Sequence, residues 1–152
     1  MSHPLHPILV HFPIALLSTA ILFEALELLL KRDFLRPAAT WLLGLGMLGG
    51  ILATVAGFWN EEAAEAAGVP ETAIDRHENL ALLTLAVFAV LLAMRWLRGR
   101  RWIPEHPAVF FLIALAGLAL LGATGYFGGD LVYRYGAGVE RAAPTTPQAE
   151  SR

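Results

Sequence analysis

Four histidines stand at the borders of the hydrophobic segments of this 152-residue chain, where imidazoles can act as metal or haem ligands. His3, His6 and His11 lead into the first apolar run, and His77 stands at the start of the third. If those runs cross a membrane as helices, all four imidazoles lie on the same side of the bilayer. His11 and His77 then begin two helices that run in the same direction, so their rings lie at similar depth. The pattern predicts a polar site shared by the first and third spans, with His6 as the substitute for either ligand.

Two kinds of group suit such a site. A b-type haem needs two imidazoles on facing helices, and His11 and His77 are the expected pair, with Thr84 on the same helix face leaving room below His77. A metal ion needs three or four ligands, for which His6, His11, His77 and Asp130 are the candidates. An imidazole at a membrane surface can also cap a helix or bond to a loop carbonyl. This structural alternative stays open for each histidine.

Four apolar runs must position these residues, at 8–30, 38–59, 79–97 and 108–127. The chain is 57% hydrophobic and 16% charged, an apolar excess that is typical of membrane proteins. Each run is close to the roughly 20 residues that cross a bilayer core, and in lipid such runs are helices because the backbone must satisfy its own hydrogen bonds. The connections between the runs are short. We therefore expect an all-α fold, an integral membrane four-helix up-down bundle.

The connections differ in charge, and this predicts the orientation. The second connection is acidic, whereas the first and third carry the basic residues Lys31, Arg32, Arg36, Arg95, Arg98, Arg100 and Arg101. Basic loops stay in the cytoplasm, so we expect both termini and the acidic connection to face outward. The protein is then a multi-pass protein of the bacterial inner (cytoplasmic) membrane.

Glu24 has the highest free-energy cost of membrane insertion among the residues inside the predicted spans. A charged side chain near the centre of a span costs about 2.5–3.5 kcal/mol unless it is paired or protonated. Glu27 can pair with Lys31, four residues further along the helix, whereas Arg95 is the natural partner of Glu24 by depth. A structural ion pair is the first interpretation, and a small transporter that uses Glu24 is the weaker alternative.

The last apolar run ends at Gly128-Gly129, which predicts that its helix ends there. The segment that follows, up to residue 139, is expected to lie on the outer membrane surface, where Asp130 or Tyr133 can support an imidazole. Residues 1–139 are thus one transmembrane domain, and residues 140–152 are expected to be a disordered tail.

Two end motifs resemble a known family. The opening H-P-I-L-V-H-F-P-I-A-L-L, from His6 to Leu17, and the closing segment from Gly128 to Val139 are similar to those of domain-of-unknown-function family 2231. The resemblance covers nearly the whole chain and implies a bacterial four-helix membrane module. Relatives joined to Rieske-type or cytochrome-type domains imply a redox setting. The matching positions are His6, His11, Gly128, Gly129, Leu131, Val132 and Tyr133. Relatives often have His where this chain has Tyr135, so a role for that position does not carry over.

These observations favour a redox-accessory or electron-transfer module that binds b-type haem, or less readily a metal ion, near the outer face between the first and third spans. The alternative is a cofactor-free membrane scaffold that docks a partner redox protein on that face. The chain has no cysteine, which excludes thiolate metal sites and covalently attached haem. We find no nucleophile–base pair, so an independent enzyme is not expected, and a net charge of -2 gives no reason to expect nucleic acid. Gly46 and Gly50 allow close helix packing, either within the bundle or in a homo-oligomer.

Overall fold

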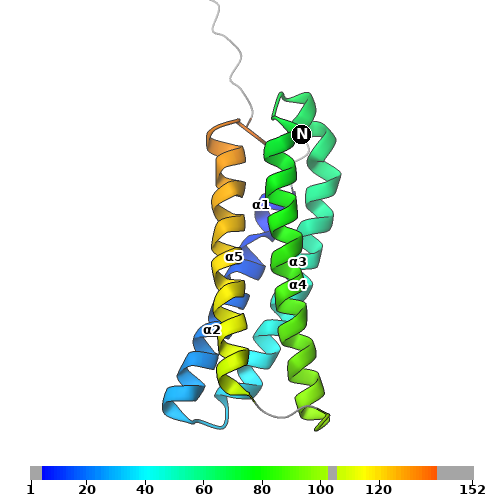
Figure 1. The fold of residues 1–152 in the computed structure, drawn as a ribbon. Helices are drawn as coiled ribbons and strands as arrows, with labels where there is room; N and C mark the ends of the chain where they lie inside the picture. The colour runs from blue at the N-terminus through cyan, green and yellow to red at the C-terminus, as the bar shows by residue number, and fades with distance from the viewer. Residues whose placement is uncertain (1–4, 103–105, 140–152) are drawn as a thin grey trace, which may run out of the picture.

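All regular structure in the described residues, 5–102 and 106–139, is helical in the computed structural model (Figure 1). The helices are α1 (Leu5–Leu9), α2 (His11–Leu30), α3 (Leu35–Ala66), α4 (Glu71–Gly99) and α5 (Pro107–Tyr133). Four segments are long and apolar enough to cross a membrane, and the first of them, His6–Leu30, contains most of α1 and all of α2. The prediction of an all-helical membrane protein with four spans is confirmed. His3 and the expected tail at 140–152 lie outside the described residues.

The four long helices form a closed bundle in which α2 packs against α3 and α5, and α4 also packs against α3 and α5. Helices α2 and α4 therefore occupy one diagonal of the bundle, and α3 and α5 occupy the other. We call the end that contains α1 and the α3–α4 connection the histidine end. The opposite end, with the α2–α3 and α4–α5 connections, is the basic end. The α3–α4 hairpin projects past α1 at the histidine end (Figure 1).

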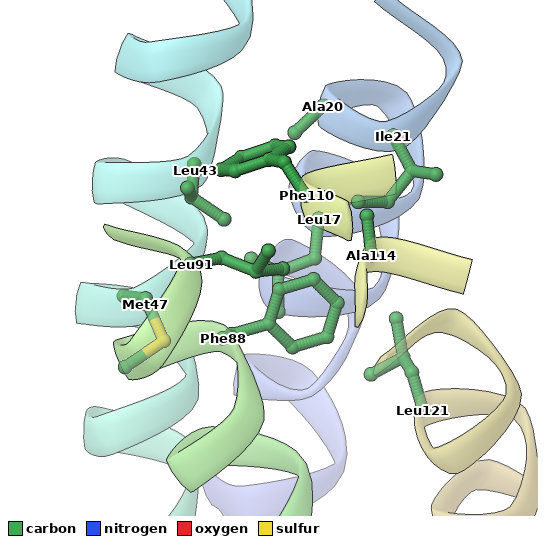
Figure 2. Packing of buried hydrophobic residues seen from close by; sticks show 10 residues of the cluster. All are labelled: Leu17, Ala20, Ile21, Leu43, Met47, Phe88, Leu91, Phe110, Ala114 and Leu121. Atoms are coloured by element: carbon green, nitrogen blue, oxygen red, sulfur yellow. The ribbon is translucent and has the colours of Figure 1, made fainter. Parts of the chain in front are cut away.

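The centre of the bundle is a cluster of apolar side chains from all four long helices (Figure 2). Phe88 and Leu91 of α4 are fully buried there, beside Leu17 of α2. Close approach is achieved with glycine, because a Cβ on Gly46 of α3 would lie 2.7 Å from Leu17 Cδ2, and one on Gly50 would meet a leucine of α4 at 2.6 Å. Gly46 and Gly50 of α3 thus serve packing inside the bundle.

The first span is interrupted at Val10, which separates α1 from α2. Proline explains the break, because Pro13 has no N–H to donate to the carbonyl four residues earlier. The predicted irregularity around His11 is confirmed. Pro13 itself is buried and packs against α3, where a Cβ on Gly49 would lie 3.3 Å from its Cδ.

The helices run beyond the apolar segments that predicted them. Helix α3 continues to Ala66 and α4 begins at Glu71, so the acidic connection is reduced to a turn that contains Gly68 with φ +88°. The prediction that Gly128-Gly129 ends the last helix is wrong, because α5 passes through both residues and ends at Tyr133. The physical reason is tertiary, since Gly128 is needed for the packing of His77 described below.

Candidate functional site

Two histidine rings contact each other at the histidine end of the bundle. They come from the first span and from α4, which lie diagonally across the bundle from each other. His6 of α1 and His77 of α4 have ring centroids 5.9 Å apart, with ring planes at 89°. Both side chains are partly buried. The diagonal from the first span to α4 is therefore bridged at this end by two imidazoles.

Each imidazole is oriented by a backbone carbonyl of a neighbouring helix. His6 Nδ1 lies 2.7 Å from the carbonyl oxygen of Ala53 in α3, and His77 Nδ1 lies 3.1 Å from that of Thr124 in α5. A carbonyl oxygen only accepts, so each Nδ1 must carry the proton and donate it. In a neutral ring this leaves Nε2 with its lone pair. An Nδ1–H held by a carbonyl is the usual arrangement of a histidine that ligates a metal through Nε2.

Glycine makes room for both rings. A Cβ on Gly57 of α3 would lie 3.2 Å from His6 Nδ1, and one on Gly128 of α5 would lie 2.8 Å from His77 Cε1. Real Cβ atoms essentially never approach another heavy atom as closely as the second distance. Each histidine therefore packs directly on the helix that also supplies its carbonyl acceptor.

His11 is placed differently from the expectation. It is exposed, and its Nδ1 lies 2.7 Å from the carbonyl oxygen of Pro7 in the preceding turn. The structure brings His77 together with His6, the substitute ligand, and not with His11. Five residues separate His6 from His11, which places them about 140° apart around an ideal helix, so only one of them can face the bundle. This spacing is a sequence signal that His6 and His11 do not share a helix face, although it does not say which of them faces the bundle.

The four-ligand metal site is not assembled. No three His, Asp or Glu side chains within residues 5–102 and 106–139 are grouped so that they could hold a metal ion. The His11 side chain is exposed, and Asp130 Oδ2 lies 3.8 Å from Nη1 of Arg134, the residue that follows α5. The candidates His6, His11, His77 and Asp130 therefore do not converge on one point.

The space expected below His77 is filled by the protein. Thr84 is buried, with its Oγ1 2.9 Å from Thr124 Oγ1, a hydrogen-bond distance that ties α4 to α5. Phe88, one turn further along α4, has no exposed surface. Below the histidine pair, the Thr84–Thr124 contact therefore comes first, and the apolar core that contains Phe88 follows.

The predicted partner of Glu24 is confirmed. Glu24 of α2 and Arg95 of α4 form a hydrogen-bonded ion pair, and both are buried at 9% and 8% exposure. The Arg95 guanidinium also lies 4.7 Å from the centre of the Phe110 ring, within the range of a cation–π contact. This second polar link joins the same diagonal as the histidines, near the basic end.

Comparison with known proteins gives one match. A family model described as a predicted membrane protein, DUF2231, matches residues 2–141, and so spans both histidines of the pair and all four membrane helices. No curated protein and no solved structure matches the chain.

Proposed function

The chain belongs to the DUF2231 family of predicted membrane proteins, and on that premise we propose that it is a redox-accessory or electron-transfer module holding b-type haem between His6 and His77. The observation that carries the proposal is the pair of imidazoles on opposite helices, each with Nδ1–H bound to a carbonyl. Both rings therefore keep Nε2 available as a ligand atom. The site expected from the sequence contained His11 and His77. The proposed site contains His6 in place of His11.

Two imidazoles come together at this end, with ring centroids 5.9 Å apart. Within residues 5–102 and 106–139 no third His, Asp or Glu side chain joins them in a group that could hold a metal ion. A group that needs only two protein ligands therefore fits the donor set better than an ion that needs three or four. Since the chain has no cysteine, the haem would be of the non-covalent b type.

Haem bound here would supply one-electron transfer through its iron. The residues of the chain have separate tasks. The carbonyls of Ala53 and Thr124 hold each imidazole in the Nε2-ligating tautomer. The Thr84–Thr124 contact and Phe88 close the bundle beneath the pair and exclude water from that side.

We infer that the histidine end faces outward in a bacterial inner membrane, with both termini on that side. The basis is the positive-inside rule, because seven of the eleven Lys and Arg residues lie in or next to the connections of the opposite end. A redox partner protein would then meet the module on the outer face.

A cofactor-free scaffold that docks a partner redox protein is the second candidate. It is favoured by the filled space below His77 and by the fact that both imidazoles already bridge helices in the structure. In this case the pair would be an interhelical brace. The ion pair of Glu24 with Arg95 favours a structural role for this carboxylate over the weaker alternative, a small transporter that uses Glu24.

Absorption spectra of the detergent-purified protein, expressed with haem supply, distinguish the two candidates. The haem proposal expects a Soret band, with sharp α and β bands after reduction. His6→Ala and His77→Ala should lose these bands, whereas His11→Ala is the matched control and should keep them. Absence of a Soret band in the wild-type protein, or equal bands in His6→Ala and the control, would overturn haem binding by this pair. Elemental analysis of the same samples tests for a metal ion in its place.

A further inference from the structure

A groove on the side of the bundle, far from the histidine pair, has no role in the proposed function. It lies between α3 and α4 in the half nearest the basic end and has a volume of about 580 Å³. Its lining is predominantly apolar and consists of Thr40, Met47, Ala89, Leu92, Ala93, Arg95 and Trp96. From Ala89 to Trp96 it extends roughly 10 Å along α4 by helical rise. The groove is therefore inside the span and open to the hydrocarbon.

An aromatic and cationic cluster stands at the mouth of the groove. Arg100 has its guanidinium carbon 4.3 Å from the Trp96 ring centre and 5.8 Å from that of Trp102, and the two indoles are 5.7 Å apart, edge to face. All three side chains are exposed. Tryptophan marks the level of the membrane surface, so Arg100 is held at headgroup depth one turn beyond the groove.

The net positive charge of the basic end favours an anionic lipid headgroup. Residues 24–36 and 95–102 together contain seven basic and three acidic side chains, and two of these, Glu24 and Arg95, pair with each other. Basic pockets between membrane helices at the cytoplasmic side are suited to anionic lipid headgroups. An apolar groove that ends at a fixed arginine in a basic surface matches an acyl chain joined to a phosphate.

We propose that this groove binds an anionic phospholipid, with an acyl chain between α3 and α4 and the phosphate at Arg100. Trp96 lines the groove and also stacks on Arg100, so it connects the two parts of the site. The site does not involve the histidine pair, and its test is independent of haem binding.

Native mass spectrometry of the full-length protein in detergent, titrated with dioleoylphosphatidylglycerol or dioleoylphosphatidylcholine, tests the proposal. The anionic lipid should bind several-fold more tightly than the zwitterionic one. One basic residue near an anionic lipid surface changes binding about fivefold, so Arg100→Gln should reduce phosphatidylglycerol binding by about that factor. Equal binding of the two lipids to the wild-type protein would overturn the proposal.

Substitutions that fill the groove test the acyl-chain part of the site separately from the charge of Arg100. Ala93→Phe, or Ala89→Phe if the first variant does not fold, should weaken both lipids several-fold. Ala119→Phe is the matched control, because Ala119 is an exposed alanine on α5, away from the groove, and it should bind lipid as the wild-type protein does. Unchanged phosphatidylglycerol binding by the filled variants refutes the acyl-chain site. The acyl-chain site is also refuted if free glycerol 3-phosphate competes fully with phosphatidylglycerol, or if the groove is covered by a second copy of the protein in a dimer that binds no lipid.

Discussion

Replacing Gly128 by alanine tests whether the orientation of His77 depends on the absence of a side chain in α5. The new Cβ would lie 2.8 Å from His77 Cε1 and 3.2 Å from its Nδ1. The ring cannot stay in place, and its bond to the carbonyl of Thr124, on the same helix one turn earlier, must lengthen or break. Gly125→Ala in the same helix is the control, since a Cβ there meets no heavy atom within 4 Å.

Three contributions set the size of the effect. Overpacking a tight site costs about 1–3 kcal/mol. An interhelical hydrogen bond in a membrane protein is worth about 0.6 kcal/mol on average and at most about 1.7. Alanine gains up to about 1 kcal/mol over glycine in a helix interior. We expect Gly128→Ala to lower the free energy of unfolding by about 1–3 kcal/mol, whereas Gly125→Ala leaves it unchanged or raises it by up to about 1 kcal/mol.

The assay is reversible unfolding in mixed micelles with sodium dodecyl sulfate, followed by circular dichroism. A second pair of proteins completes the test, because in a His77→Ala background the new methyl group meets no ring and Gly128→Ala should behave like the control. If Gly128→Ala destabilises both backgrounds equally, the contact between this glycine and His77 is not the cause and the reasoning fails.

Two further predictions use the same unfolding assay. Glu24→Ala removes the carboxylate that the buried Arg95 faces and should cost about 3–5 kcal/mol, while replacing both residues by leucine should recover much of that loss, so a double variant as unstable as Glu24→Ala contradicts a specific pair. Gly46→Ala should cost about 1–3 kcal/mol because its Cβ would lie 2.7 Å from Leu17 Cδ2. Gly44→Ala, where the space is open, should be neutral or slightly stabilising, and equal losses in the two variants would contradict this packing argument.

Hydrophobicity and depth were sufficient to predict the four spans and the Glu24–Arg95 pair. Both depend on the bilayer, which imposes a length on apolar runs and a cost on an unpaired charge. The ends of the helices were not predictable in the same way. Helix α3 continues to Ala66 and α4 begins at Glu71 in charged sequence, so hydropathy does not mark where those helices stop.

Local glycine and histidine signals were the weaker guides. Gly128-Gly129 has the composition of a helix end, but α5 continues through both residues and Gly128 packs against His77, a contact that only the tertiary structure reveals. Depth alone placed His11 level with His77 without saying which way its ring faces. That depends on rotation about the helix axis, and the break at Val10 changes the rotation between α1 and α2.

The two polar links of the bundle share one spacing. Eighteen residues separate His6 from Glu24 in the first span, and eighteen separate their partners His77 and Arg95 in α4. In α4, which is continuous, eighteen residues make five full turns, about 27 Å, and return to the same side of the helix. The first span has the same number of residues between His6 and Glu24, across its break at Val10. The diagonal helices are therefore matched at two points, one near each membrane surface.

Two fixed points define a line, so this match sets both the axial register of the diagonal helices and the angle between them. The apolar core between the links tolerates small sliding, because its contacts are not directional. With a lever arm of about 27 Å, a shift of about 1 Å at one link tilts the helix by only about 2°. A rigid-body tilt of α4 against α2 by a larger angle would therefore also strain the Glu24–Arg95 pair, so we expect this pair at the basic end to resist such tilts and to keep α4 in the orientation that presents His77 to His6.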